Sequence, residues 1–440
     1  MQVCEVRKKV IIVGGGFAGI EAAKYLGRNA PNVDVIVIDR LSYTTFQPLL
    51  YQVALGVLSP SDITRPVRSI LSPYRNVEVI LSEVIDIDRT ARSITLVDSM
   101  QLSFDYLVLA TGCTSSYFGN DSWAESAPSL KSIDDAIEVR SRVLLAFEEA
   151  EYMAARTGAT PSLHFVIIGG GPTGVELAGA LADITQRVLN RDFRHIRTED
   201  SKISLYEGGD TILAAFPPDL QEKGKQQLMS LGVSVHTKTR ITEIGARHLV
   251  VGDQRIDATV VLWAAGVAPS TLGKKLGLPL DRRGAVEVDS FLNPSGEPNI
   301  FVCGDLASAT ENGKRIPAVA QPAMQMGKHA AIAILADLNG KPRTPFHYFD
   351  KGDMATIGTR KAVARIAWPF RAQWSGRPAW LTWLFVHLAF LSGADHQLSV
   401  LFTWLYAYLT KTTRSRLIGI PHTGILPRDS DHHPQSKEVS

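Results

Sequence analysis

The chain of 440 residues has little cysteine and almost no net charge. Its three cysteines, Cys4, Cys113 and Cys303, stand far apart and form no CxxC pair, so the sequence predicts neither a metal site nor a redox dithiol. The 46 basic and 44 acidic residues leave a net charge of +2. Such a weak charge argues against nucleic acid as a partner, because nucleic-acid-binding surfaces are strongly basic.

Long apolar segments are also missing. The first nine residues contain no apolar signal-peptide core and no small-residue cleavage site, so we expect the chain to stay on the cytoplasmic side of the cell membrane. Two apolar runs near the end of the chain, residues 380–391 and 398–409, are twelve residues long. A helix that spans a bilayer needs about 20 apolar residues. The sequence therefore predicts no transmembrane helix there.

What the sequence does contain is one glycine signature in two copies. Residues 14–19 read GGGFAG and residues 169–174 read GGGPTG. Each copy follows an apolar run typical of a buried strand and opens an alanine-rich helical pattern. In this arrangement the glycines make the turn, admit a pyrophosphate to the backbone and let helix and strand pack closely. Two copies predict two bound dinucleotides, as in a flavoprotein that takes electrons from a nicotinamide.

Around the first signature we expect a strand at residues 10–13, a helix at 17–29 and a strand at 35–39. Asp39 ends that strand twenty residues after the last signature glycine, where a carboxylate accepts the ribose hydroxyls; the alternative is a solvated acid. A strand at 104–109 completes a doubly wound sheet. The residues assigned to this site are Gly14, Gly15, Gly16, Phe17, Ala18, Gly19, Asp39, Arg40, Val84, Ala110, Thr111 and Gly112.

Around the second signature we expect a strand at 163–168, a helix at 173–189 and a strand at 203–207. Glu207 ends the last of these, and its carboxylate favours a free ribose 2′-hydroxyl over a 2′-phosphate. The sequence therefore predicts NADH rather than NADPH. A strand-end turn at 263–266 is expected to close over the nicotinamide. The residues assigned to this site are Gly169, Gly170, Gly171, Thr173, Gly174, Glu207 and Gly266.

The two apolar runs near the end of the chain carry Trp and Tyr at their boundaries. Arg371 and Arg377 precede them, and Lys411 and Arg416 follow. This composition favours helices that lie in a membrane interface. A dimer interface or buried core helices are the alternative, and a dimer is compatible with membrane attachment.

With these features in place, the chain resembles the type II NADH dehydrogenases, the single-subunit, non-proton-pumping NADH:quinone oxidoreductases, from about residue 8 to residue 417. Three segments carry the likeness beyond the glycine signatures: residues 46–53, residues 320–325, which match the motif AQxAxQ, and residues 361–364. The resemblance implies non-covalent FAD at the first site, NADH as substrate at the second and a membrane quinone as acceptor. It also implies a homodimer attached peripherally to the cytoplasmic face of the cell membrane.

The resemblance gives the expected fold class, which is α/β with an NADH-binding Rossmann-like domain inserted into an FAD-binding one. The FAD-binding domain is expected at residues 1–118 and 289–345, and the NADH-binding domain at 119–288. Residues 346–420 would form the region of membrane attachment and dimerisation. Residues 421–440 are polar and contain Pro and His, which predicts a disordered tail.

The resemblance also implies roles for individual side chains. Glu176 would face the nicotinamide and flavin and relay a proton, or merely complement the helix dipole. Gln321 and Gln325 are four residues apart and share one helix face, so they would present amides to the quinone and the flavin edge, or satisfy backbone groups. Lys361 would stabilise negative charge on reduced flavin, or lie at the surface. Asp305, in a segment like the second flavin motif, and Ala320 would contact FAD.

Two other enzymes share much of this pattern. A soluble FAD-dependent NADH reductase of a protein electron carrier would lack the aromatic C-terminal helices. A sulfide:quinone oxidoreductase would need cysteines beside the flavin, for which Cys113 and Cys303 are the candidates. The segment at residues 46–53 and the glutamine motif favour the NADH dehydrogenase.

Overall fold

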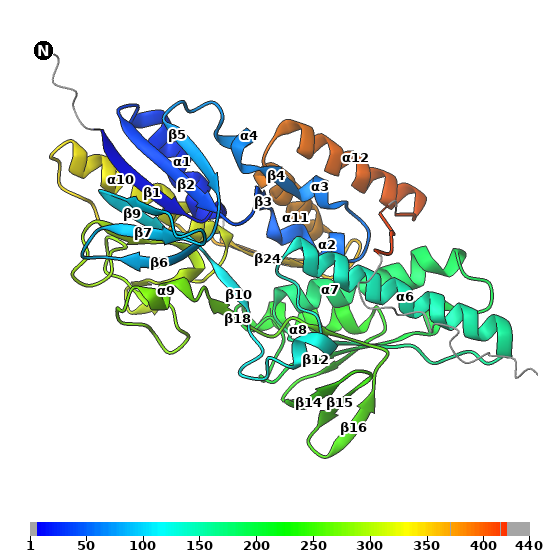
Figure 1. The fold of residues 1–440 in the computed structure, drawn as a ribbon. Coiled ribbons are helices and arrows are strands. Elements are labelled where there is room, and N and C mark those ends of the chain that lie inside the picture. The colour runs from blue at the N-terminus through cyan, green and yellow to red at the C-terminus, as the bar shows by residue number, and fades with distance from the viewer. Residues whose placement is uncertain (1–6, 370, 414, 420–440) are drawn as a thin grey trace, which may run out of the picture.

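The structure is a computed structural model that describes residues 7–369, 371–413 and 415–419. Cys4 and the tail predicted at 421–440 lie outside these residues. Two α/β units lie side by side, with two further helices against both of them (Figure 1).

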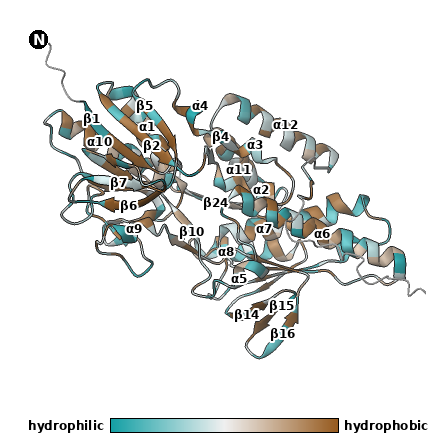
Figure 2. Cartoon of the chain, viewed as in Figure 1, coloured by the Kyte–Doolittle hydropathy of each residue, from teal (hydrophilic) through white to brown (hydrophobic). Residues whose placement is uncertain are grey.

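The first unit is built on a five-stranded sheet whose strands are all parallel. Its order is β20 (Ile300–Val302), β9 (Tyr106–Leu109), β1 (Lys8–Val13), β2 (Val33–Asp39) and β5 (Val77–Leu81). Figure 2 shows β1 and β2 as strongly hydrophobic, as expected for strands covered on both faces. The helices α1 (Phe17–Asn29) and α10 (Ala320–Leu338) pack closely, because a side chain at Gly327 would meet the Ala18 carbonyl oxygen at 1.9 Å.

The second unit has a four-stranded parallel sheet. Its order is β13 (Val233–His236), β12 (Lys202–Tyr206), β11 (His164–Ile168) and β17 (Val260–Trp263), with the helices α6 (Ile133–Thr157), α7 (Pro172–Asp183) and α8 (Pro218–Met229). All four strands fall in sequence between β9 and β20 of the first sheet. The predicted fold class, two Rossmann-like units with one inserted into the other, is confirmed.

The helix predicted at residues 173–189 is shorter than expected. The α-helix α7 stops at Asp183, and a π-helical turn, η2 (Ile184–Val188), and a 3₁₀ turn, η3 (Leu189–Arg191), follow. Ile184 and Leu189 are buried, so the hydrophobic pattern continues although the helical geometry changes. Periodicity alone does not separate these helix types.

Smaller antiparallel sheets decorate the two units. They are β6 (Val84–Asp88), β7 (Ser93–Leu96) and β8 (Gln101–Ser103); β14 (Ile241–Gly245), β15 (His248–Val251) and β16 (Gln254–Asp257); and β24 (Gly352–Thr356), β25 (Ala362–Ile366) and β26 (Ala372–Ser375). The pair β10 (Cys113–Ser115) and β18 (Val267–Pro269) links the segments that run between the two main sheets.

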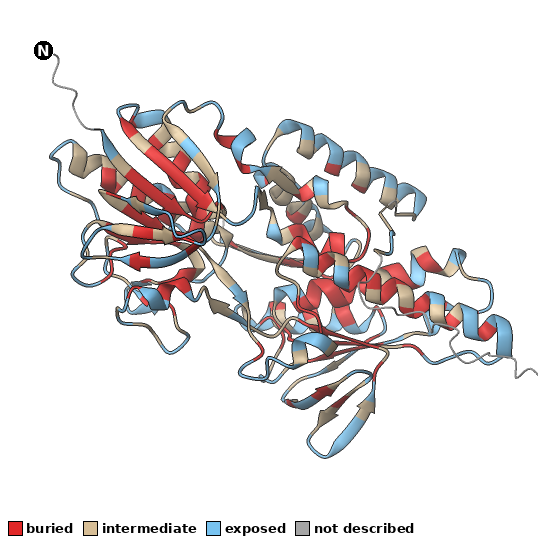
Figure 3. Ribbon diagram, in the orientation of Figure 1, coloured by how far each residue is buried: buried red, intermediate tan, exposed pale blue. Residues whose placement is uncertain are grey.

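The last two helices, α11 (Arg377–Phe390) and α12 (Ala394–Thr410), each bury one narrow face. Trp383 and Trp404 are 1% and 3% exposed and belong to the core of the second unit. The opposite faces are exposed (Figure 3) and carry Leu381, Phe385, Leu398, Leu401, Phe402, Leu405 and Leu409.

Across the described ranges, no helix combines the length and the hydrophobicity that crossing a membrane requires.

Candidate active site

The first glycine turn has the geometry that a dinucleotide requires. Gly14 adopts a φ of +108°, and a side chain there would meet the Ala110 carbonyl oxygen at 2.3 Å. A side chain at Gly19 would meet the Gly14 carbonyl oxygen at 1.8 Å. By contrast, nothing lies within 4 Å of a side chain built at Gly16, the N-cap of α1. The start of α1 therefore offers free N–H groups and open space for an anion.

Asp39 stands where the sequence places it, at the end of β2. Its carboxylate accepts hydrogen bonds from the backbone N–H of Gly15 (2.5 Å) and Leu41 (2.7 Å). A carboxylate has about four lone-pair sites, so two remain for ribose hydroxyls. Arg40, the next residue, is exposed, and Val84 is buried at the start of β6.

Near the same carboxyl ends of these parallel strands, close to the first glycine turn, two buried side-chain oxygens have no hydrogen-bond partner among the described residues. They are Thr111 Oγ1 and Gln321 Oε1. Asp305 follows β20; it accepts a hydrogen bond from Cys113 Sγ (2.9 Å) and lies 3.7 Å from Lys131 Nζ. Buried polar atoms normally have partners, so unpartnered oxygens beside a phosphate-binding turn fit a polar cofactor such as FAD.

The second glycine turn repeats the first. Gly169 adopts a φ of +115°, and a side chain there would lie 2.5 Å from the Ala264 carbonyl. Above Gly171 the space is open. Glu207 accepts hydrogen bonds from the backbone N–H of Gly170 and Gly209, at 2.6 Å each, as Asp39 does in the first unit. The same turn and the same type of carboxylate fit a second dinucleotide.

Between the two units lies a pocket, which we call the chamber. One wall comes from the segment 47–51 of the first unit and the other from α7 and the turn after β17. Its lining includes Gln47, Pro48, Leu50, Tyr51, Lys131, Thr173, Glu176, Trp263 and Gly266. The chamber therefore lies beside the second glycine signature, through Thr173 and Gly266, and near Asp305, whose carboxylate is 3.7 Å from Lys131 of the lining.

Glu176 is the buried acid of this chamber and is 8% exposed. Burial raises the pKa of its carboxyl to about 8, although the Thr356 backbone N–H, which donates to Oε1 at 3.3 Å, and the nearby Trp383 lower it. The Trp383 indole nitrogen does not itself reach hydrogen-bonding geometry. A carboxyl with a pKa near 8 is largely protonated at neutral pH and has a proton to donate.

The two glutamines of α10 differ in what they bind. Gln325 is fully engaged with the backbone of Phe349: it donates to the carbonyl at 3.0 Å and accepts from the N–H at 2.9 Å. Gln321 donates to the Gly352 carbonyl at 3.1 Å, which leaves its side-chain oxygen unpartnered within the described residues. Gln321 is therefore the glutamine with capacity for a ligand.

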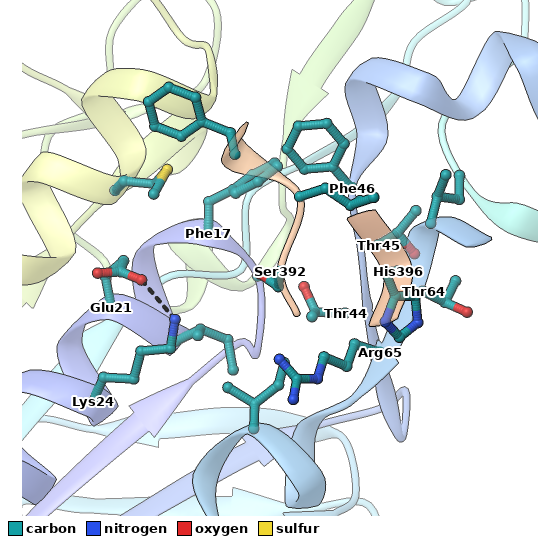
Figure 4. Close-up of a pocket in the computed structure, with 17 residues that line it drawn as sticks. Phe17, Glu21, Lys24, Thr44, Thr45, Phe46, Thr64, Arg65, Ser392 and His396 are labelled. Carbon is teal, nitrogen blue, oxygen red and sulfur yellow. Dashed lines mark hydrogen bonds and ion pairs between the residues drawn. The ribbon is translucent and has the colours of Figure 1, made fainter. Parts of the chain in front are cut away.

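A second cavity lies between α1, the strands β3 (Tyr43–Thr45) and β4 (Thr64–Pro66), α10 and the connection from α11 to α12. The rings of Phe17 and Phe46, 6.0 Å apart, lie together on one side of it, while Arg65 and His396 lie on the other (Figure 4). Phe390 and Leu391 also line this cavity. It thus connects the glycine turn of α1 with the exposed C-terminal helices.

Comparison with known proteins agrees with this geometry. The sequence profile of the pyridine nucleotide-disulphide oxidoreductase family matches residues 8–327. The type II NADH:quinone oxidoreductase Ndh of Mycobacterium tuberculosis is 39% identical over 426 residues, which are 93% of this chain and 90% of that protein. The corresponding enzyme of Haemophilus influenzae is 29% identical and covers 82% and 87%. The chain belongs to the type II NADH:quinone oxidoreductases of this family.

Solved structures share the fold. The NDH2 of Plasmodium falciparum, solved in complex with NADH, superposes with a TM-score of 0.82 at 21% identity and covers 91% of this chain and 98% of that one. The sulfide:quinone oxidoreductase of Aquifex aeolicus gives a TM-score of 0.72 at 18% identity and covers 87% and 90%. The architecture is thus common to enzymes with different electron donors. The residues of the site, and not the fold, distinguish these enzymes.

The cysteines argue against sulfide chemistry in this type II oxidoreductase. Burial and the Asp305 carboxylate raise the pKa of Cys113 to about 12, and burial raises the pKa of Cys303 further. Both thiols therefore stay protonated at neutral pH, whereas the thiolate is the nucleophilic form.

The structure places Lys361 away from the chamber. Its ammonium group donates to Ser230 Oγ at 2.6 Å and lies near Asp183, at the far end of α7. Burial lowers the pKa of Lys361. Glu176 and Gly266 line the chamber, but Lys361 does not.

Sequence reasoning gave no role to several residues that shape this site. Tyr51 and Lys131 line the chamber, and Trp383 lies against Glu176. Tyr51 lies within the segment 46–53, which resembles the family. Trp383, however, is one of several aromatic residues in a C-terminal helix. Nothing in the surrounding sequence predicts that it lies near Glu176.

Proposed function

We propose that this chain oxidises NADH and reduces a lipid quinone through non-covalent FAD, without pumping protons. In the overall reaction, NADH, one proton and quinone give NAD⁺ and quinol. The observation that carries the proposal is the chamber, since it lies beside the second phosphate-binding turn, is near Asp305 and holds a protonated acid. Membership of the type II NADH:quinone oxidoreductases supports it.

FAD, when bound, supplies the redox chemistry, because its ring accepts a hydride and releases two electrons. The residues of the chain place the reactants. Gly14–Gly19 and Asp39 would hold the FAD pyrophosphate and ribose, and Asp305, Thr111 and Gln321 the rest of the cofactor. The turn from Gly169 and the Glu207 carboxylate would hold NADH.

Glu176 would hold the proton that the reaction consumes. Its carboxyl is buried among Leu50, Tyr51 and Trp263 in the lining of the chamber, which excludes water and favours the protonated form. A general acid works best with a pKa near the operating pH. A pKa of about 8 satisfies that condition.

The second cavity is the proposed quinone site. Phe17, Phe46 and Met324 give it an apolar interior, and Met324 lies between Gln321 and Gln325 on α10. Phe390 and Leu391 connect it to α11 and α12, whose apolar faces are exposed. A lipid-soluble quinone would reach such a cavity from the bilayer, while NADH reaches the chamber from water.

Attachment to the cytoplasmic face of the cell membrane, as a peripheral protein and a homodimer, is part of the proposal. The exposed apolar residues of α11 and α12 support it, because soluble proteins rarely expose a large contiguous apolar patch. Aromatic side chains with nearby cations are typical of a membrane interface. Lys351 lies over the Phe390 ring at 5.1 Å.

The test is a two-step flavin titration of the protein purified in detergent. NADH is expected to bleach the flavin absorbance, and a short-chain quinone is expected to restore it. Bleaching without reoxidation by quinone would rule out a quinone reductase. A flavin that NADH leaves oxidised would rule out the proposal as a whole.

A further inference from the structure

A buried chain of hydrogen bonds runs from α12 to the chamber. The Trp404 indole N–H donates to Gln52 Oε1 at 2.7 Å, and Gln52 Nε2 donates to the Tyr51 hydroxyl oxygen at 2.9 Å. Gln52 and Tyr51 are both 5% exposed, and Trp404 is 3% exposed. Tyr51 also lines the chamber, as does Glu176. The C-terminal helix is therefore connected to the chamber through three side chains.

The chemistry of the first residue fixes the orientation of the other two. An indole N–H is a donor only, so Gln52 must turn its oxygen toward Trp404 and its amide nitrogen toward Tyr51. The Tyr51 oxygen then accepts from Gln52, and the hydroxyl hydrogen must point elsewhere. Because Tyr51 is buried, that hydrogen has no bulk water to face. Tyr51 lines the chamber, and Glu176 and Tyr408 are titratable neighbours of its hydroxyl group.

Aromatic packing holds this chain in place. Trp383 of α11 lies 5.7 Å from the Trp404 ring and 6.3 Å from the Tyr51 ring. Its other face stacks on His387 at 4.1 Å. Trp383 is 1% exposed and also contacts the Glu176 carboxyl. The C-terminal helix α11 thus packs Trp383 against Tyr51 and beside Glu176.

We propose that Trp404, acting through Gln52, orients the Tyr51 hydroxyl as a hydrogen-bond donor into the chamber, beside Glu176. Tyr51 contacts the nicotinamide there, and Gln52 and Trp404 are positioning residues for hydride transfer from NADH. This inference rests on the proposed function. According to this inference, α12 positions a residue of the NADH site in addition to its proposed role at the membrane. Small displacements of a positioning group in an active site reduce rates strongly.

The test separates a loss of protein stability from a loss of the orientation of the Tyr51 hydroxyl group. Trp404→Phe keeps an aromatic ring but leaves Gln52 Oε1 buried and unpaired. The double variant Trp404→Phe with Gln52→Leu removes both polar partners, so it restores stability, since replacing both members of a buried pair by apolar groups is nearly neutral. It does not restore the donor to Tyr51. Tyr51→Phe removes only the hydroxyl, and Phe402→Leu, on the exposed face of α12, is the control.

Three quantities are measured on the flavin-loaded protein: the unfolding temperature, the rate of flavin reduction by NADH in a stopped-flow instrument, and the rate of reoxidation by a short-chain quinone. We expect Trp404→Phe to lower the unfolding temperature by about 2 to 4 °C and the double variant to recover it. Flavin reduction is expected to fall about tenfold in Trp404→Phe, in the double variant and in Tyr51→Phe. Reoxidation is expected to stay within about twofold, and Phe402→Leu to match the wild type in all three.

Two outcomes overturn the inference. If the double variant recovers both stability and the rate of flavin reduction, the chain only supports the fold. If Tyr51→Phe reduces its flavin at the wild-type rate, the hydroxyl has no role in the chamber. Failure of the proposed function is distinct from both, because the wild-type flavin itself would then not respond to NADH.

Discussion

Glu207 illustrates how a single carboxylate can close a turn and keep capacity for the proposed ligand. It closes the second glycine turn with two backbone hydrogen bonds of 2.6 Å, and about two of its lone-pair sites remain free. Asp39 does the same in the first unit. At this scale the chemistry of the residue decides which nucleotide fits.

We expect Glu207→Gln to relax the discrimination against NADPH by about tenfold or more, because the charge that repels a 2′-phosphate is removed. The amide keeps an oxygen for the turn. The measurement is kcat/KM with NADH and with NADPH. Asp210→Asn, three residues away with a side chain that is 87% exposed, serves as control. An unchanged ratio in Glu207→Gln would reject Glu207 as the ribose ligand.

Glu176 gives a prediction about pH. Burial raises the folded-state pKa from 4.5 to about 8, so between these values the folded protein binds more protons than the unfolded chain. The stability from the neutral carboxyl is fully present below pH 4.5 and is lost as the pH rises toward 8. We expect the wild type to lose a few kcal/mol of unfolding free energy over this range relative to Glu176→Gln. The measurement is the unfolding free energy of both proteins from denaturation curves at pH 5 and at pH 8. If the difference between the two proteins is the same at both pH values, Glu176 is not a buried acid with a raised pKa.

Each glycine signature forms a strand–turn–helix element, and the glycines of this element have different roles. Gly14 needs a positive φ and lacks room for a side chain, whereas Gly16 has a φ of −81° and open space above it. In this element, therefore, Gly14 is required by the backbone, whereas Gly16 leaves open space for the proposed ligand.

We expect Gly14→Ala to destabilise the apoprotein by about 2 kcal/mol or more, because the strained φ and the contact with Ala110 both penalise a methyl group. Gly16→Ala is expected to leave the unfolding temperature of the apoprotein unchanged and to weaken FAD binding about tenfold or more, because its methyl group would occupy the phosphate position. Thermal unfolding and flavin titration of both variants check this. Equal FAD affinity in Gly16→Ala and the wild type would exclude a phosphate from that space.

In the whole molecule, α11 and α12 contribute both to the buried core and to an exposed apolar surface. Their buried faces supply Trp383 and Trp404 to the core of the second unit, while their opposite faces carry the exposed apolar residues. Removal of both helices would therefore uncover core as well as abolish the proposed membrane contact. Substitutions on the exposed face are the cleaner test.

We expect Phe385→Ser together with Phe402→Ser to reduce co-sedimentation with lipid vesicles severalfold, because each exposed Phe loses about 1.5 to 3 kcal/mol of apolar burial in the bilayer. Flavin reduction by NADH should not change. Leu81→Ser, at a residue of β5 that is 57% exposed, is the control for losing an exposed apolar side chain elsewhere. If vesicle binding persists but the dimer dissociates in sedimentation velocity, the face is a subunit interface.

The two glycine signatures and their strand-end acids could be predicted from the sequence because they are local. A turn, a helix start and a strand-end carboxylate, 20 residues further on in the first copy and 33 in the second, follow from residue type and local pattern. The difference in hydrogen bonding between Gln321 and Gln325 could not be predicted in that way. Both lie on the same face of α10, and only the position of Phe349 shows that Gln325 is occupied by backbone groups.

By itself the sequence determined two dinucleotide sites, the α/β class and the apolar C-terminal helices, since each depends on periodicity or short-range spacing. Only the tertiary structure decided which residues form the chamber. Tyr51 and Glu176 line it, whereas Trp383 packs against Tyr51 and Trp404 reaches it through Gln52; these residues come from helices spread over some 350 positions. Lys361 is turned toward Ser230 instead. Contacts between distant segments depend on how whole surfaces pack, and no local pattern encodes them.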